Sequence, residues 1–302
     1  MKPLVKYRGG KSKEIIYIEK HIPNFTGRYI EPFFGGGALY FYLRPKEAII
    51  NDINSKLIAF YEGVKSNFEH LKKELAEIEC AYTENQKNFE QLKLNNPDQR
   101  VENKNEDLYY LFRDMFNGLT NKSYSDAALY FFLNKTAYSG MIRYNSKGEF
   151  NVPFGRYKNL NTSLVTKEHS DLLSSTAIYN LDYSNIFNMA RKDDFVFLDP
   201  PYDCVFSDYG NIEYKDGFNE SNHSELAKKF NSLNCKALMV IGKTPLTERL
   251  YSDMIVDEYG KSYAVNIKNR FKSSASHILV SNYGHHQQEN YNKNSNNELI
   301  AL

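Results

Sequence analysis

One short stretch near the start of the chain limits the possible folds more than any other feature. Residues 28–30 read as the end of a strand, and the following EPFFGGGALYFYL reads as a glycine-rich turn and the first turns of a helix. A second strand, EAIINDIN, then ends at Asn51 and Asp52. This order of strand, turn, helix and strand opens a βαβ unit, so we expect a parallel sheet with right-handed crossovers.

The rest of the chain divides into strand-rich and helix-rich parts. Strand-type runs return in TAIYNLDYS, FVFLDPPYD, KALMVIGK and HILVSNY. From residue 55 to about 126, Lys/Glu-rich segments carry apolar residues at helical spacing, and the polar interval 93–107 reads as a loop between helices. The simplest arrangement is a split α/β domain, residues 1–55 and 166–302, with a mostly helical insert at 56–165. The Asn-rich tail, 284–298, has too few apolar residues to pack, and we expect it to be disordered.

Composition narrows the class of protein. Lys plus Arg total 38 against 37 for Asp plus Glu, so any basic surface for a polyanion has to be local. The three cysteines are far apart and lack CxxC spacing, which argues against a zinc site and a disulfide framework. The sequence contains neither a signal peptide nor an apolar run long enough to cross a membrane. We therefore expect a cytoplasmic protein with no metal ion and no membrane partner.

The glycine-rich turn predicts a nucleoside site. After Phe34, Gly35 and Gly37 let the backbone approach a ligand, although such a turn is also found as a plain tight connection. Asp52 ends the second strand, where a carboxylate can hold a ribose diol; its other interpretation is the N-cap of the next helix. Neither GxxxxGK[ST] nor GxGxxG occurs, so the phosphate-free S-adenosylmethionine fits best. Lys11 would receive its carboxylate, unless it is an ordinary surface lysine.

The segment FVFLDPPYD predicts a rigid catalytic loop at residues 199–202, which we call the DPPY ledge. Its four apolar residues read as a strand buried on both faces, and the two prolines then stop the strand in a stiff, extended conformation. If Asp199 and the Pro200 carbonyl accept the N–H bonds of a nucleobase amine, its lone pair is freed for a sulfonium methyl. Tyr202 would stack on that base, which has to be flipped out of a duplex. The plainer interpretation is a proline turn with a capping Asp.

Several motifs occur in a characteristic order: YRGGK, EPFFGGGAL, NDIN, YSGMIRYNSKGEFNVPFGRY and FLDPPY. Together they resemble the Dam-type DNA adenine-N6 methyltransferases, over residue 7 to about residue 283. The resemblance implies a Rossmann-like methyltransferase sheet and methyl transfer from S-adenosylmethionine to adenine N6 in double-stranded DNA. It assigns cofactor contacts to matching positions: Tyr7, Lys11, Phe34, Gly35, Gly37, Asp52 and Asp199, with Asp182 and Tyr183 beside the cofactor adenine. One partner consistent with this family is a cognate restriction endonuclease acting on the same site.

The insert carries a basic stretch interleaved with aromatic residues, NKTAYSGMIRYNSKGEFNVPFGRYK. With SKG as its turn, it can form a β-hairpin that lies on DNA and makes the insert, 56–165, a target-recognition domain. In that interpretation Arg143 reads a base edge, in a GATC target, and the lysines hold phosphates. A solvated charged loop is the other interpretation. Family members often carry Asn where this chain has Ser139. The predicted DNA contacts are Lys135, Tyr138, Ser139, Met141, Arg143, Asn145, Lys147, Pro153 and Arg156.

The residues by themselves are also compatible with other functions. An RNA methyltransferase acting on exocyclic amines uses a similar ledge, and a catalytically silent DNA-binding protein could use this fold. Cytosine-C5 methylation is disfavoured because it needs a nucleophilic thiol, usually after a proline, and none of the three cysteines follows one. Cytosine-N4 methylation is chemically close, and the leading Asp of the ledge favours adenine only weakly.

Overall fold

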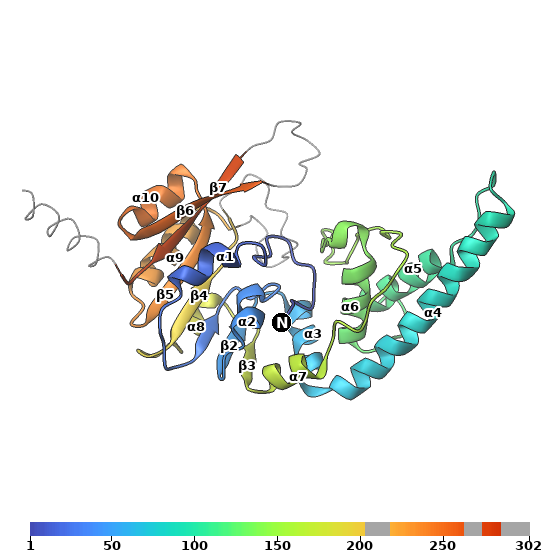
Figure 1. The fold of residues 1–302 in the computed structure, drawn as a ribbon, viewed down its shortest axis with the longest axis horizontal. Coiled ribbons are helices and arrows are strands. Elements are labelled where there is room, and N and C mark those ends of the chain that lie inside the picture. Colours follow the sequence, from blue (N-terminus) through green and yellow to red (C-terminus); the bar gives the residue numbers. More distant parts are fainter. Residues whose placement is uncertain (203–217, 263–273, 285–302) are drawn as a thin grey trace, which may run out of the picture. The chain divides into compact units, whose positions relative to one another are not determined.

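The computed structural model describes residues 1–202, 218–262 and 274–284. Seven strands in this part of the chain form one sheet in the order β3-β2-β1-β4-β5-β7-β6 (Figure 1). The described residues divide into two compact units. The first unit comprises residues 1–15 and 33–183, and the second comprises the remaining described residues.

The first unit contains two parallel strands and most of the helices. Strand β2 (Ala48–Asn51) pairs in parallel with β3 (Thr176–Tyr179), with Ile49 opposite Ala177. Helix α2 (Ala38–Leu43) follows the glycine-rich turn and leads to β2, as the βαβ pattern predicted. The other helices of this unit are α3 (Ser55–Ser66), α4 (Phe68–Asn95), α5 (Lys104–Phe116), α6 (Asp126–Thr136) and α7 (Lys167–Ser174), with a short 3₁₀ turn η2 (Tyr138–Gly140).

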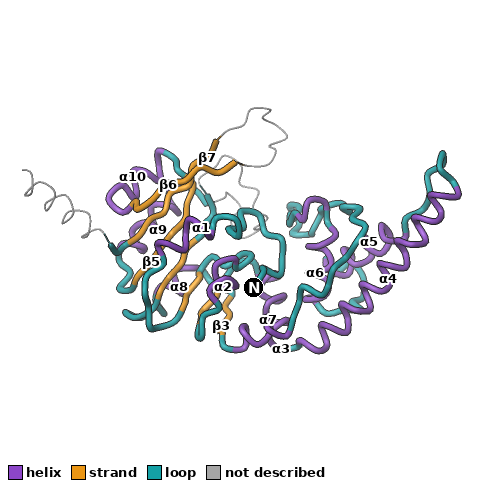
Figure 2. The backbone as a smooth tube through the Cα atoms, in the orientation of Figure 1, coloured by secondary structure: helices purple, strands orange, loops and turns teal. Residues whose placement is uncertain are grey.

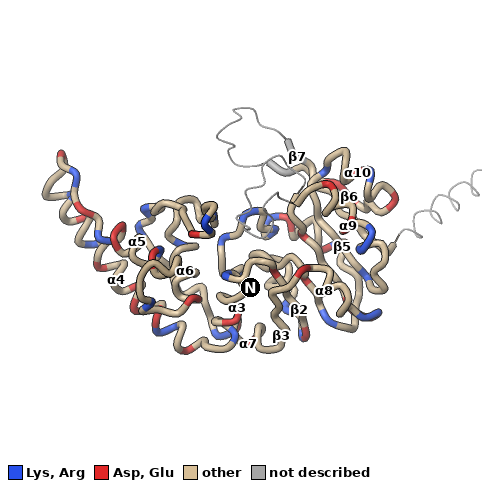
Figure 3. Tube along the Cα trace, turned by 180° about the vertical axis from the view of Figure 1, so that it is seen from behind, with Lys and Arg blue, Asp and Glu red and all other residues tan. Residues whose placement is uncertain are grey.

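The segment between α3 and α7 consists of helices and loops, with bridge pairs only in the basic stretch (Figure 2). Helices α5 and α6 begin at side-chain caps, Asn103 and Ser125, whose oxygens accept the first free N–H groups. The loop expected at 93–107 is confirmed but shorter, because α4 continues to Asn95 and α5 starts at Lys104. Acidic and basic residues are interspersed along α4 (Figure 3).

The second unit contains the rest of the sheet. Strands β1 (Tyr29–Glu31), β4 (Phe195–Leu198) and β5 (Lys236–Gly242) are parallel. Strand β7 (Ser274–Ser281) is antiparallel to β5, and β6 (Ile255–Ser262) is antiparallel to β7. Helices α9 (Glu220–Asn231) and α10 (Pro245–Tyr251) complete the unit, α1 (Ile15–Ile18) and α8 (Tyr183–Phe187) lie at the unit boundaries, and η1 (Glu19–His21) and η3 (Ser252–Met254) are 3₁₀ turns.

The predicted fold class, an α/β protein with a Rossmann-like sheet, is confirmed. All four residues of β4 are buried, as its unbroken apolar run indicated. Strand β6 was not expected, because its sequence IVDEYGKS alternates too weakly to stand out. The functional division into 1–55 with 166–302 and 56–165 stays a prediction. The predicted disorder of residues 285–298 lies outside the described residues.

An ion pair between the half-buried Arg28 and the buried Asp194 fixes the start of β1 and β4. The Arg28 guanidinium contacts Asp194 at 2.6 Å, and the Arg28 backbone N–H also donates to this carboxylate. Burial alone would raise the pKa of Asp194, but the hydrogen bonds from Arg28 and from the Arg191 backbone outweigh it and hold the pKa below 3.8. Because Asp194 immediately precedes β4, this pair holds the start of the strand that ends in the DPPY ledge.

We expect Asp194→Asn to lower the free energy of unfolding by about 3 kcal/mol, because it removes the buried carboxylate that pairs with the half-buried Arg28 guanidinium. Asp193→Asn, which changes the exposed neighbouring carboxylate, is the matched control and should have little effect. Urea unfolding at neutral pH measures the difference. Since the folded pKa of Asp194 is depressed, its contribution is present above pH 3.8 and lost as the pH falls through the folded value. A difference that persists unchanged in acid would contradict this account.

Candidate active site and nucleic-acid interface

The Asp52 carboxylate ties the glycine-rich turn to the end of β2. Its Oδ2 accepts the Gly35 N–H at 2.8 Å, and its Oδ1 accepts the Asn54 N–H at 2.9 Å. The side chain is buried, with 6% of the residue exposed. The alternative role as the helix cap belongs to Asn54, whose amide oxygen accepts the N–H groups of Lys56 and Leu57. Asp52 therefore anchors the turn predicted to bind the cofactor.

The turn itself requires glycine at two positions. Gly35 and Gly37 have φ values of 50° and 63°, in the left-handed region. A Cβ at Gly35 would lie 2.8 Å from the Tyr7 ring, and one at Gly37 would lie 2.4 Å from the Phe34 ring. The structure thus brings four predicted cofactor residues together with Asp52. Tyr61 also supports the turn, because its hydroxyl donates to the Gly35 carbonyl at 3.1 Å.

Two asparagines that the sequence did not single out connect the ends of β2 and β3. The Asn51 side chain exchanges two hydrogen bonds with the Leu181 backbone, and Asn180 donates to the carbonyls of Asp52 and Ile53. These bonds hold the NLDYS segment beside the end of β2. Asp182 in this segment is exposed, whereas Tyr183 is buried, with its ring 5.1 Å from that of Phe33. An amide after a strand is a weak sequence signal, because it is equally typical of turns.

Lys11 is buried, with only 3% of the residue exposed, so it is not an ordinary surface lysine. Its Nζ donates to the Gly9 carbonyl at 2.7 Å. Burying an ammonium group costs free energy unless oxygen atoms or anions pair with it. This burial fits the predicted role of Lys11 as a receiver of a carboxylate, and its contact with a cofactor stays a prediction.

The DPPY ledge lies in the second unit, at the carboxyl end of β4. Asp199 follows Leu198 directly and is half-buried, and Pro200 is buried. The Tyr202 ring packs edge-on to the His277 ring of β7 at 5.0 Å. A Cβ on Gly242, the last residue of β5, would lie 3.3 Å from the Tyr202 ring. The ledge is thus held by packing from the neighbouring strands of its own unit.

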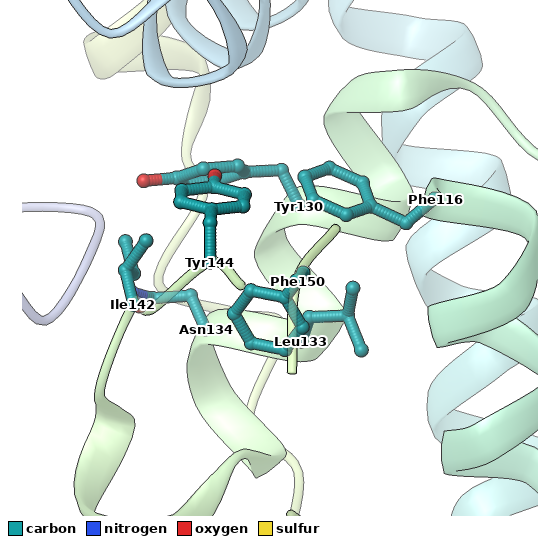
Figure 4. Close-up of a pocket in the computed structure, with 7 residues that line it drawn as sticks. All are labelled: Phe116, Tyr130, Leu133, Asn134, Ile142, Tyr144 and Phe150. Carbon is teal, nitrogen blue, oxygen red and sulfur yellow. The ribbon is translucent and has the colours of Figure 1, made fainter. Parts of the chain in front are cut away.

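The basic stretch of the insert folds back on itself as the predicted hairpin, with isolated bridge pairs instead of long strands. Tyr144 and Phe150 form an antiparallel bridge, and the Asn151 N–H donates to the Arg143 carbonyl at 3.1 Å. The rings of Tyr144 and Phe150 lie 6.0 Å apart on one face. There they line a pocket with Ile142 from the same hairpin (Figure 4). The remaining lining residues belong to α5 and α6: Phe116, Tyr130, Leu133 and Asn134.

The base of the hairpin gathers further predicted DNA contacts. The Tyr138 N–H donates to the Pro153 carbonyl at 2.9 Å, so these two residues are neighbours. Tyr138 and Met141 are exposed large side chains. Ser139 has φ 55° and ψ 13°, a left-handed conformation that Asn adopts more readily than Ser. This conformation is a physical reason for Asn in family members, and it needs no DNA contact.

Two of the basic residues predicted to contact DNA interact with other groups of the protein: Arg156 pairs with a carboxylate, and Lys135 has a lowered pKa. Arg156 is exposed, has φ 54° and lies 3.5 Å from Glu106. Burial, followed by the nearby charge of Lys6, lowers the pKa of Lys135 to about 8. A bound phosphate would oppose both effects on Lys135 and favour its charged form. Lys147 lies in the exposed turn of the hairpin, where its N–H donates to the Asn145 side chain.

The described residues contain neither a membrane-spanning helix nor a cluster of metal-ligating side chains. No helix of the described chain is long and apolar enough to cross a membrane. Within residues 1–202, 218–262 and 274–284 no three acidic, histidine or cysteine side chains are grouped as a metal site would require.

Comparison with known proteins identifies the family. Residues 7–270 match the family model of D12 class N6 adenine-specific DNA methyltransferases. The type II methyltransferase M.CviBI of Paramecium bursaria Chlorella virus NC1A is 32% identical over 94% of this chain and 100% of its own length. The type II methyltransferase M.MjaIII of Methanocaldococcus jannaschii is 34% identical over 89% of this chain and 90% of its own length. The DNA adenine methylase of Escherichia coli K12 is 32% identical over 66% of this chain and 64% of its own length.

The sheet, the glycine-rich turn and the DPPY ledge are features of a methyltransferase. The chain belongs to the D12 class of N6 adenine-specific DNA methyltransferases, since the family model covers most of its length. It is an adenine-specific DNA methyltransferase, and its resemblance to the Dam-type enzymes is confirmed. This membership decides against the alternatives of an RNA methyltransferase and a cytosine-specific enzyme. The roles of individual residues stay predictions.

Proposed function

We propose that the methyl donor is S-adenosylmethionine and that the first unit holds it. Asp52 fixes the turn through two backbone N–H groups, and a carboxylate at the end of β2 is suited to the hydroxyls of a ribose diol. Buried Lys11 is suited to the donor's carboxylate, and Tyr183 offers a ring to its adenine. The other proposed contacts in this unit are Tyr7, Phe34, Gly35, Gly37 and Asp182, and Asp199 at the end of β4 is a further one. When bound, this donor supplies an electrophilic methyl group on a sulfonium.

The DPPY ledge prepares the target amine for attack. The exocyclic amine of adenine is a poor nucleophile because its lone pair is conjugated with the ring. The Asp199 carboxylate and the Pro200 carbonyl accept its two N–H bonds, which directs the lone pair at the methyl carbon. Methyl transfer would form the N–C bond as the sulfonium S–C bond breaks, which would leave the donor as a neutral thioether, and the methylated amine would release one proton to solvent water. The proline pair fixes the backbone, so these acceptors need not be ordered during the reaction.

The target adenine is flipped out of the duplex in this proposal, since base stacking hides its amine. The Tyr202 ring, packed against His277 and Gly242, offers a preformed face for the extruded base. Stacking on this face offsets part of the cost of unstacking.

We infer a GATC target from the recognition hairpin, residues 141–152. Its sequence resembles that of the Dam-type enzymes, and the DNA adenine methylases of Haemophilus influenzae and Escherichia coli K12 are each 32% identical to the chain over the matched residues. Arg143 places its planar fork on N7 and O6 of a guanine. The other contacts to DNA are Lys135, Tyr138, Ser139, Met141, Asn145, Lys147, Pro153 and Arg156, with phosphates held by the lysines.

Two further inferences concern the setting of the enzyme. Relatives named type II methyltransferases suggest a cognate restriction endonuclease that cuts the same site. A DNA substrate and cysteines without CxxC spacing favour the cytoplasm.

The observation that carries the proposed mechanism is the position of Asp199, directly after the buried strand β4 and before two prolines. We expect Asp199→Ala to reduce methyl transfer by about 100-fold or more, because the lost acceptor acts on the transition state. Transfer of a labelled methyl group from S-adenosylmethionine to duplex DNA measures the rate. Asp193→Ala, which removes an exposed carboxylate before β4, is the matched control and should keep the wild-type rate. Near-wild-type turnover by Asp199→Ala would refute the mechanism.

Substitutions of Arg143 and Lys147 test the proposed GATC target. Arg143→Ala should relax discrimination at one base position, because a bidentate arginine–guanine pair contributes about 1–3 kcal/mol of specificity. Lys147→Ala, if it removes a phosphate contact, should weaken binding to all sequences evenly and lower the salt dependence. Methylation rates on duplexes containing GATC and on single-base variants test both. A wild-type preference for another tetranucleotide contradicts the target, and an even loss for Arg143→Ala makes Arg143 a phosphate contact.

A further inference from the structure

The recognition hairpin has two distinct faces. Tyr144 opposes Phe150 across the antiparallel bridge, and both rings line the pocket against α5 and α6 (Figure 4). Side chains alternate between the faces of an extended segment, so the adjacent residues project to the opposite face. Arg143 and Asn151 are opposite each other in the same register, since the Asn151 N–H donates to the Arg143 carbonyl. Their side chains therefore lie together on the face that points away from the pocket.

Asn151 holds the Arg143 guanidinium by one edge. The Nε–H donates to Asn151 Oδ1 at 2.9 Å, and Nη2 donates to the Asn151 backbone carbonyl at 3.4 Å. Nε and Nη2 make up one edge of the planar group, and both of them point to the same asparagine. The other edge, formed by Nη1 and Nη2, keeps donors for a second planar partner. This is the edge that an end-on fork to guanine N7 and O6 uses.

A second cross-strand pair, Asn145 and Glu149, is also hydrogen-bonded on the hairpin face that points away from the pocket. Asn145 and Glu149 are also opposite each other: the Asn145 N–H donates to the Glu149 carbonyl at 2.9 Å, and the side-chain amide donates to the carboxylate at 2.8 Å. The Asn145 amide oxygen accepts the Lys147 and Glu149 N–H groups, which fixes the turn. Both cross-strand pairs thus give a DNA-facing side chain a fixed partner on the returning strand.

We propose that Asn151 is a positioning residue for base recognition, which it performs by fixing the Arg143 fork before DNA binds. This inference rests on the proposed function, in which Arg143 reads a guanine. A free arginine loses several rotatable bonds when it binds, and this entropy cost weakens its preference for the correct base. Because Asn151 fixes the side chain before binding, part of this entropy cost is already met. Asn151 also limits the guanidinium to one orientation, so the guanidinium cannot shift to form hydrogen bonds with a wrong base.

The test compares kcat/KM on duplexes that carry the site preferred by the wild type with duplexes that carry each single-base variant. Asn151→Ala should lose roughly tenfold in discrimination at the same position that Arg143→Ala affects, and little elsewhere. Adding Asn151→Ala to Arg143→Ala should cause no further loss of discrimination, because both changes remove one interaction. Asn161→Ala, in an exposed loop outside the hairpin, is the matched control.

Asn151→Asp keeps the oxygen that accepts the Nε–H, so its discrimination should remain close to wild type. Its added negative charge near phosphates should raise KM evenly for all sequences. Thermal unfolding confirms that each variant is folded. Discrimination that is unchanged in Asn151→Ala, or a loss of rate that is equal on every duplex, would overturn the inference alone. A wild type that methylates no DNA would overturn the proposed function and this inference with it.

Discussion

Two hydrogen bonds to one buried carboxylate organise the region where the donor is proposed to bind. Asp52 accepts the Gly35 N–H from the glycine-rich turn and the Asn54 N–H from the start of α3. Backbone hydrogen bonds join Gly37 to Phe34 and Phe34 to Asn51, and the Asp52 carboxylate adds the bond that holds the left-handed Gly35. Tyr61 and Tyr7 pack on the same turn, and the β3 segment is fixed beside Asp52 by Asn51 and Asn180.

The same principle recurs elsewhere in the chain: polar groups at strand and hairpin ends are fixed by the protein before a ligand arrives. Arg143 is held by Asn151, and Asn145 is held by Glu149. The DPPY ledge is fixed differently, by its prolines and by the packing of Tyr202 on neighbouring strands. Groups that are already oriented need little reorganisation when they act, which favours both specificity and rate.

The strands with unbroken apolar runs and the glycine turn could be predicted from the sequence, because local composition determines them. β4 and the turn before α2 are examples. The partners of Asp52 and Arg143 could not be predicted, since they depend on pairing register. A charged hairpin sequence does not reveal that Asn151 faces Arg143, whereas the observed register makes it plain. Asn54, not Asp52, caps α3. The sequence could not distinguish the two, because both residues lie near the start of the helix and both are common N-cap residues.

Asp52 anchors the glycine-rich turn and, in the proposed function, the methyl donor as well. Calorimetric titration of S-adenosylmethionine into wild type and Asp52→Ala, without DNA, tests this directly, with the exposed acid Glu47→Ala as the matched control. Hydrogen bonds to a charged group contribute about 1.5–3 kcal/mol, so we expect Asp52→Ala to bind roughly tenfold or more weakly and Glu47→Ala to bind like wild type. Equal affinities for wild type and Asp52→Ala would contradict the account.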